Sequence, residues 1–372
     1  MKRFAAIAAV SLAGANVLFA QGQSKSAPIR NLSAQASARQ ASDSWREACW
    51  KAQNQKLSAA ELLGTIETVM KIPSHGPCWF ARATAPQQIQ FIRSCLFKQF
   101  QVLLKNKDTG TKESLKSAGM MLAQGIHDHF HAPQNYLRWT NQADWNFKAA
   151  LAGMPEYKNM TDRLYAKGSE TLHLKELGKI AELYFLTHHM ENADLLIHAQ
   201  DSNNLNMGET DKYENLFILS FHPDLIKTNP ATSSSQIFES KNHIWDEALA
   251  TGSHELRHAS QAYLDSAQTD PDTPKTSIFR SPEFGLMAKL YDGKSYKIWA
   301  KILNLWPLED KVGFKFYKLI PHEKDAFEHE IMARDLKDDS LVIHMAKRSP
   351  PTSRYKNPQK SGRANPPHPH GP

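Results

Sequence analysis

Apolar residues recur every three or four positions along much of the chain, which is the spacing of one buried face of an α-helix. The runs AAELLGTIETVMKI, QQIQFIRSCLFKQFQVLLK and ESLKSAGMMLAQGIHDHF show this spacing, with Pro and Gly between them. The same spacing continues through residues 170–200, ETLHLKELGKIAELYFLTHHMENADLLIHAQ. Residues 43–227 are therefore predicted to form a helical region.

The pattern changes in the second half of the chain. ENLFILSFHPDLI, at 214–226, has the pattern of a short strand, and the Pro/Ser/Thr-rich segment TNPATSSSQ, at 228–236, has that of a boundary between domains. Beyond this boundary IFESKNHI is predicted to be a strand, and helical spacing covers 245–267, 285–306 with a break at Gly293, and 322–336. We therefore predict a mainly α (α+β) fold, in which the helical region is followed by a second domain, residues 228–346, with a small sheet.

Both ends of the chain differ in composition from the part between them. Residues 1–20 combine two early positive charges, an apolar segment and a final Ala20, which predicts a secretory signal peptide and therefore an exported protein, periplasmic or secreted. An uncleaved N-terminal anchor is the alternative. Residues 21–42 are small and polar, as in a flexible linker, and the Pro-rich residues 347–372 are predicted to be a disordered basic tail.

Charge and cysteine content exclude several classes of protein. The formal net charge of +7 comes from the leader and from the tail, which has six Lys and Arg and no acidic residue, so the remaining chain is close to neutral and no nucleic-acid partner is expected. Beyond the leader no apolar run is long enough to span a bilayer. Of Cys49, Cys78 and Cys95, one pair is expected to form a disulfide in an oxidising compartment, and all three pairings stay open.

His254, Glu255 and His258 form an HExxH motif within the helix predicted at 245–267. Four residues slightly exceed one helical turn, so the two imidazoles project from one face and can bind a single zinc ion. Glu255 stands next to the first ligand, where its carboxylate can accept a proton from a metal-bound water and pass it to a leaving amine. The motif therefore predicts a Zn²⁺ site with Glu255 as the general base.

The stretch GSHELRHASQ resembles the active-site helix of zincin metallopeptidases, in particular bacterial metallopeptidase domains of the form HELxHAxQ. In gluzincin-type members, a Glu on a second helix, often in an ExxA pattern, is the third zinc ligand. This resemblance covers roughly residues 232–340 and implies Glu323 as the third ligand, with Asp325 placed like the second acid of the family. Glu330 is the alternative ligand. No further histidine follows His258 at the spacing of the metzincins, which disfavours a three-histidine site.

The motif and the resemblance together imply an exported zinc-dependent metallopeptidase that acts on a protein or peptide substrate, peptidoglycan peptides included. Zn²⁺ would be held by His254, His258 and Glu323. Two alternatives belong to other classes of protein: a catalytically inactive zincin-fold binding protein, and a helical interaction protein of the cell envelope. Residues 43–227 would be a prodomain or a substrate-recognition module.

Other polar residues have simpler interpretations. HDHFH, at 127–131, places two histidines four residues apart and allows a second metal site, but histidines at a helix end are the preferred interpretation. His188 and His189 are expected to hydrogen-bond locally. Arg257 is expected to be solvated, and Gln261 is expected to support a ligand or to pack between helices.

Overall fold

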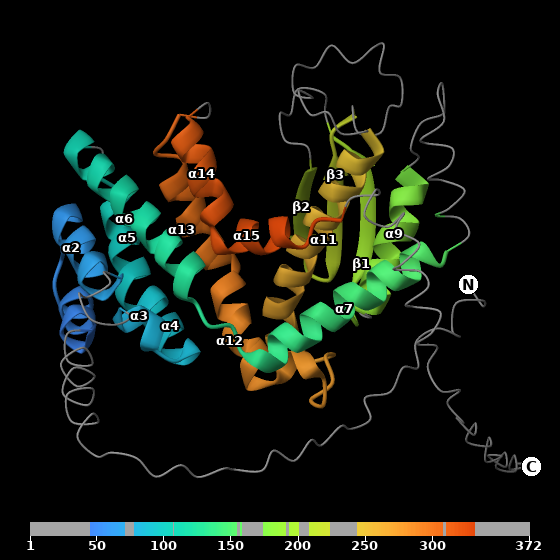
Figure 1. Cartoon of the computed structure of the whole chain (residues 1–372), viewed down its shortest axis with the longest axis horizontal. Coiled ribbons are helices and arrows are strands. Elements are labelled where there is room, and N and C mark those ends of the chain that lie inside the picture. The colour runs from blue at the N-terminus through green and yellow to red at the C-terminus, as the bar shows by residue number, and fades with distance from the viewer. Residues whose placement is uncertain are drawn as a thin grey trace, which may run out of the picture.

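The computed structural model describes residues 45–70, 78–106, 108–154, 157, 174–190, 193–200, 208–223, 244–307 and 310–331. The predicted signal peptide, the linker, the boundary at 228–236 and the tail at 347–372 lie outside these residues. So does the strand predicted at 237–244 except for its last residue, Ile244, which is helical. Within them the fold is mainly helical with one small sheet, which confirms the predicted fold class (Figure 1). The described strands lie within residues 194–221, so the expectation that the small sheet belongs to the second domain, residues 228–346, is wrong for this sheet.

The helices up to α6 (Thr109–His129) form a bundle, drawn in blue and teal in Figure 1, whereas α7 (Gln134–Ala152), drawn in green, packs against α9 (Leu174–Thr187). The helical spacing predicted there is confirmed. After a helix over 45–54, the elements are α2 (Ala59–Met70), α3 (Trp79–Arg82), α4 (Ala85–Gln90), the π-helix η1 (Phe91–Phe97), α5 (Lys98–Leu103), α6 and α7. Prolines and short polar caps separate them: Asp108, for example, begins α6 by accepting a hydrogen bond from the backbone N–H of Thr111.

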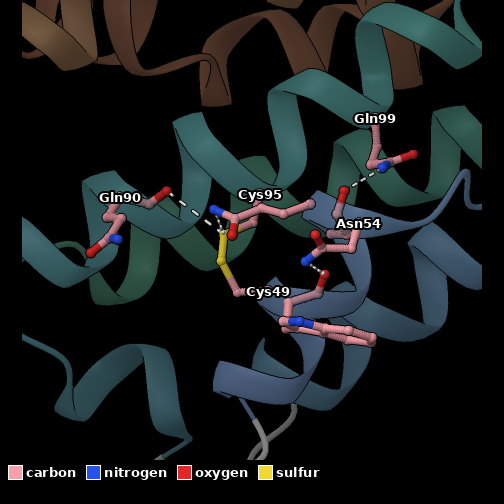
Figure 2. Close-up of a disulfide and its surroundings, with 8 residues drawn as sticks. Cys49, Asn54, Gln90, Cys95 and Gln99 are labelled. Atoms are coloured by element: carbon pink, nitrogen blue, oxygen red, sulfur yellow. Dashed lines mark hydrogen bonds between the residues drawn. A yellow bond between two sulfur atoms is a disulfide. The ribbon is translucent and has the colours of Figure 1, made fainter.

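A disulfide between Cys49 and Cys95 ties the helix over 45–54 to η1 (Figure 2). The buried side chain of Gln99 supports the same contact, because its amide group donates to the carbonyl oxygens of Ala52 and Gln55 near the end of that helix. These carbonyls have no partner within their own helix, so Gln99 satisfies them. Cys78 is free and buried. Of the three pairings left open by the sequence, the structure therefore has Cys49 with Cys95.

The sheet has three strands in the order β1-β3-β2. α9 (Leu174–Thr187) precedes β1 (Asp194–Ala199), which is parallel to β3 (Leu216–Phe221), and β2 (Gly208–Tyr213) is antiparallel to β3. β3 confirms the strand predicted at 214–226. The helical spacing predicted through residue 200 is wrong after α9, because the apolar run in Asp194–Ala199 is a strand.

The long helix α11 (Ile244–Thr269) packs against β2 and β3 and confirms the helix predicted at 245–267. Leu249, Leu256 and Tyr263 are buried at intervals of seven residues on its apolar side. The helices that follow are η2 (a short 3₁₀-helix, Ile278–Arg280), α12 (Pro282–Tyr291), α13 (Gly293–Leu303), α14 (Lys311–Leu319) and α15 (Pro321–Glu328). The predicted break at Gly293 is present: Asp292 ends α12 and caps α13.

The helix predicted at 322–336 is shorter in the structure. α15 begins at Pro321, whose fixed φ suits the first helical position, and ends at Glu328. The next residue, His329, has left the helical region with φ −107° and ψ 6°. Glu330 therefore lies beyond the helix rather than two turns along it from Glu323.

One continuous apolar core runs through the described residues, from Trp45 to Ile331. It includes aromatic side chains of the helical bundle and of the later helices in direct contact, as where the rings of Phe97 and Trp299 pack edge to face. The division at 228–236 stays a prediction, but the two parts of the chain share this core. No helix in the described part of the chain has the length and apolar character needed to cross a membrane.

Candidate metal centre

Three side chains from two helices converge on one point. His254 and His258 lie one turn apart on α11, and their Nε2 atoms are 3.1 Å from each other. Oε2 of Glu323, from the first turn of α15, lies 3.3 Å from each of these two nitrogens. In the described part of the chain, these three residues form the only cluster of His, Cys, Asp or Glu able to hold a metal ion. The site residues taken from the motif and from the resemblance are thus brought together.

The other nitrogen of each imidazole faces an acceptor. Nδ1 of His254 is 3.1 Å from Oε1 of Glu330, and Nδ1 of His258 is 3.0 Å from Oε1 of Gln261. The amide of Gln261 is itself oriented, because its Nε2 donates to the backbone oxygen of His322 and to Asp325. Each Nδ1 therefore carries a proton, and in a neutral imidazole the Nε2 then presents a lone pair.

The arrangement fits a bound cation. Two Nε2 lone pairs and a carboxylate oxygen face one another at 3.1–3.3 Å, and this buried oxygen of Glu323 has no hydrogen-bond donor. Such a convergence is repulsive unless positive charge lies between the atoms. A tetrahedral zinc ion, with ligands at about 2.0–2.1 Å, would need its ligand atoms about 3.3–3.4 Å apart. Two imidazoles and one carboxylate are also the donor set that suits an open zinc site.

The electrostatics of the cluster also favour a bound cation. Burial opposes protonation of His254, but its contacts with Glu323 and Glu330 outweigh this and raise its pKa to about 9. His258 behaves similarly: burial opposes its charge, and Glu323 raises its pKa. Burial also opposes the charge of Glu323, yet the two histidines hold its pKa well below the usual range. The cluster therefore attracts positive charge, which a proton or a metal cation can supply.

Glu255 lies beside the cluster and points toward the sheet rather than toward solvent. Its side chain is buried, and its Oε2 accepts a 2.7 Å hydrogen bond from the hydroxyl of Thr210 on β2. Burial raises the pKa of Glu255, while the charges of His258 and His254 lower it. A carboxyl group whose pKa is raised binds a proton more readily than a free glutamate does, which suits a group that exchanges protons beside the candidate metal site.

Behind the ligands lies a buried network of charges. Arg257 is fully buried, so the expectation that it is solvated is wrong: its guanidinium makes two hydrogen bonds to Asp325, of 2.7 and 2.9 Å. Asp325 also accepts from Gln261, whose amide oxygen supports His258. Gln261 thus contacts the candidate ligand His258, and its role as support for a ligand stays a prediction. This network joins α11 to α15 directly behind the three ligand atoms.

The network continues to α7 and to the end of α9. His329 follows α15 and contacts Asp144 of α7 at 3.1 Å through its Nε2, and it contacts the backbone oxygen of Asp325 through its Nδ1. The other oxygen of Asp144 lies 3.0 Å from Nε2 of the buried His188 at the end of α9. His188 also makes the expected local contact, with the Tyr184 carbonyl. The first half of the chain therefore helps to hold the segment that carries Glu323.

Three contributors to the site were missed by sequence reasoning. Thr210 lies on a strand that was not predicted, and Asp144 lies in a helical region with no recognised motif; no pattern in the sequence marks either residue. Glu330 was considered only as a competing ligand. Its place beside Nδ1 of His254 could be inferred only once the end of α15 was known.

The histidines of HDHFH are not members of this cluster. His127 and His129 are in the last turn of α6, and His131 bonds through its Nε2 to the backbone oxygen of Ala81. Their positions agree with the interpretation as histidines at a helix end.

Comparison with known proteins does not identify a family for this chain. No protein-family model matches the chain, and neither a curated protein nor a solved structure matches it significantly. The functional assignment therefore depends on the geometry of the cluster and on the motif that produces it.

Proposed function

We propose that this protein is an exported zinc-dependent metallopeptidase, with Zn²⁺ held by His254, His258 and Glu323 and with Glu255 as the general base. The observation that carries the proposal is the convergence of two oriented Nε2 lone pairs and one carboxylate oxygen at 3.1–3.3 Å. The buried carboxylate of Glu255 stands one residue after the first ligand, which is the position that the hydrolytic reaction requires.

In this proposal each side chain has a separate task. Zinc, when bound, polarises the scissile carbonyl and makes a water molecule acidic enough to lose a proton near neutral pH. Glu255 accepts the proton of the attacking water and then gives it to the leaving amine, so that the peptide bond breaks without a free amide anion. Glu330 and Gln261 keep the two imidazoles in the tautomer that leaves Nε2 free.

Two tyrosines border the cluster. Burial raises the pKa of both Tyr296 and Tyr317, and the negative charge of Glu323 raises it further. The pKa of Tyr296 rises to about 12. Both phenols therefore keep their protons at neutral pH. In the proposed reaction the exposed Tyr296 is a hydrogen-bond donor available to a substrate, whereas Tyr317 interacts with Glu323.

The test compares the wild-type protein with Glu255→Gln. The variant should keep the fold and about one zinc per chain, because Glu255 is not a ligand, and should lose turnover by about 10²- to 10⁴-fold, the usual contribution of a general base. Cleavage of a mixed protein substrate and of peptidoglycan fragments is followed by mass spectrometry of new termini.

The matched control is Glu328→Gln, which neutralises an exposed glutamate paired with Lys324 on α15 and should leave zinc content and turnover unchanged. Cleavage that survives both Glu255→Gln and a chelator would overturn the catalytic assignment. Protein that binds one zinc and cleaves none of the substrates would support the binding-protein alternative instead.

A further inference from the structure

The strand β2 lies against α11 at the position of Glu255. Alternate residues of β2 face the helix, as the two-residue period of a strand requires: Gly208 and Thr210 are partly buried, whereas Glu209 and Asp211 between them are exposed. β2 is fixed in register by its antiparallel pairing with β3. Two consecutive inward positions of this strand therefore meet the helix where it carries Glu255.

Thr210 contacts Glu255 twice. Its hydroxyl lies 2.7 Å from the carboxylate Oε2 and 2.9 Å from the backbone oxygen of the same residue. Thr210 is β-branched, so its χ1 angle is restricted within the strand and the hydroxyl has a defined direction. The carboxylate of Glu255 is thus held at one oxygen by a group that neither belongs to α11 nor binds the metal.

Gly208 contributes by its lack of a side chain. A Cβ atom at this position would lie 2.7 Å from Cγ and 2.8 Å from Oε1 of Glu255, and 2.8 Å from a methyl carbon of Thr251. These distances are shorter than normal contacts between such atoms, so even alanine would displace the glutamate or the strand. Only glycine leaves room for the observed position of the carboxylate.

We propose that Thr210 and Gly208 are positioning residues for the general base: β2 holds the Glu255 carboxylate through the Thr210 hydroxyl and accommodates it at Gly208. The role of this contact in catalysis rests on the proposed function. The contact between Thr210 and Glu255 is independent of that function, and it can be tested without measuring turnover.

The first test is a double-mutant cycle on the chelator-treated full-length protein, with Thr210→Val, Glu255→Ala and the combination. Valine keeps the shape of threonine without the hydroxyl. The loss in the unfolding equilibrium constant caused by Thr210→Val should be about 3- to 30-fold larger in the wild-type background than in the Glu255→Ala background, as expected for two groups in contact. The backbone oxygen of Glu255 is present in both backgrounds, so the difference isolates the contact with the carboxylate.

Thr65→Val is the matched control. The Thr65 side chain is buried on α2, and its hydroxyl donates to a backbone oxygen, as that of Thr210 does, but it makes no contact with Glu255. It should show no coupling to Glu255→Ala. A coupling for Thr210 no larger than that for Thr65 would overturn the inference.

The second test separates positioning from a merely structural role. Thr210→Val and Gly208→Ala should lower kcat by about 10- to 100-fold, as small displacements of catalytic groups do, with KM and zinc content unchanged. Thr210→Ser, which restores the hydroxyl, should recover most of kcat. Unchanged kcat in Thr210→Val would also overturn the inference. A wild-type protein without turnover would refute the proposed function alone, because the double-mutant cycle still decides whether the contact exists.

Discussion

At the scale of single residues, Glu323 and Glu330 contact different atoms of the same imidazole. Glu323 faces Nε2 of His254, where a metal ion would bind, and Glu330 faces Nδ1 on the other side of the ring. We therefore expect Glu323→Gln to abolish stoichiometric zinc binding and Glu330→Gln to weaken zinc affinity only about 10- to 100-fold, the usual effect of removing a partner of a ligand. Competition with a chromogenic chelator measures both. If Glu330→Gln abolishes zinc binding and Glu323→Gln only weakens it, Glu330 is the ligand.

Asp325 and Arg257 form the buried ion pair behind the ligands. Removal of the carboxylate in Asp325→Asn leaves the buried guanidinium uncompensated, which should lower the free energy of unfolding by about 3–5 kcal/mol. Glu328→Gln, which removes only an exposed pair with Lys324, should cost less than about 1 kcal/mol. Denaturant titration of both variants at pH 7 measures the two free energies of unfolding. Equal losses would contradict the expectation that the buried pair stabilises the fold more than the exposed pair does.

The same ion pair predicts a dependence on pH. Burial opposes the charge of Asp325, but Arg257 outweighs it and holds the pKa of Asp325 below its usual range. A carboxyl group whose pKa is lower in the folded state stabilises the fold above its unfolded pKa of about 3.9, and this stabilisation is lost as the pH falls. The difference in stability between wild type and Asp325→Asn should therefore shrink below about pH 4. A difference that stays constant down to pH 3 would argue against the pair.

At the scale of elements, the disulfide joins two helices of the bundle through cysteines that are 46 residues apart in sequence. Closing a loop of this length in the unfolded chain corresponds to about 4 kcal/mol in the chain-entropy model, and measured values are usually about 2–4 kcal/mol. The variant Cys49→Ala/Cys95→Ala should lose this amount of stability. Thiol titration of the unreduced wild type should find no reactive thiol in the native protein, because Cys78 is buried, and one after unfolding. Three thiols in the unreduced, unfolded protein would refute the pairing.

The elements that the sequence predicted correctly have a clear pattern of apolar residues within their own sequence. The spacing of apolar residues in α11 is regular over 26 residues, and β3 is a short apolar run after a turn. β2 was missed because its sequence GETDKY has no apolar face, and its inward residues Gly208 and Thr210 contact a polar side chain instead of the core. The sequence predicted helix at β1 because its short apolar run, separated from the end of α9 by six residues, continues the helical spacing.

At the scale of the whole molecule, the candidate site combines local and distant contributions. His254 and His258 were predictable because helix geometry alone places them on one face. Glu323 was named through the family resemblance, since nothing local links α11 to α15. Thr210 and Asp144 could not be predicted, because their contacts depend on how β2 and α7 pack, and no spacing in the sequence reports that packing. Such residues become visible only in the folded molecule.

This dependence predicts that residues 228–372 do not form a functional unit alone. In the full chain, β2 and β3 pack against α11, Thr210 contacts Glu255, and Asp144 contacts the segment that follows α15 through His329. Without residues 43–227 the apolar side of α11 would face water, and the network behind Arg257 would end at His329. We expect the fragment to unfold without a cooperative transition and to bind less than one zinc per chain, as measured by circular dichroism and metal analysis. A chain that lacks only residues 1–42 is the control and should behave as wild type. A fragment that unfolds cooperatively and binds one zinc would show instead that the helical region is a separable module, as a prodomain would be.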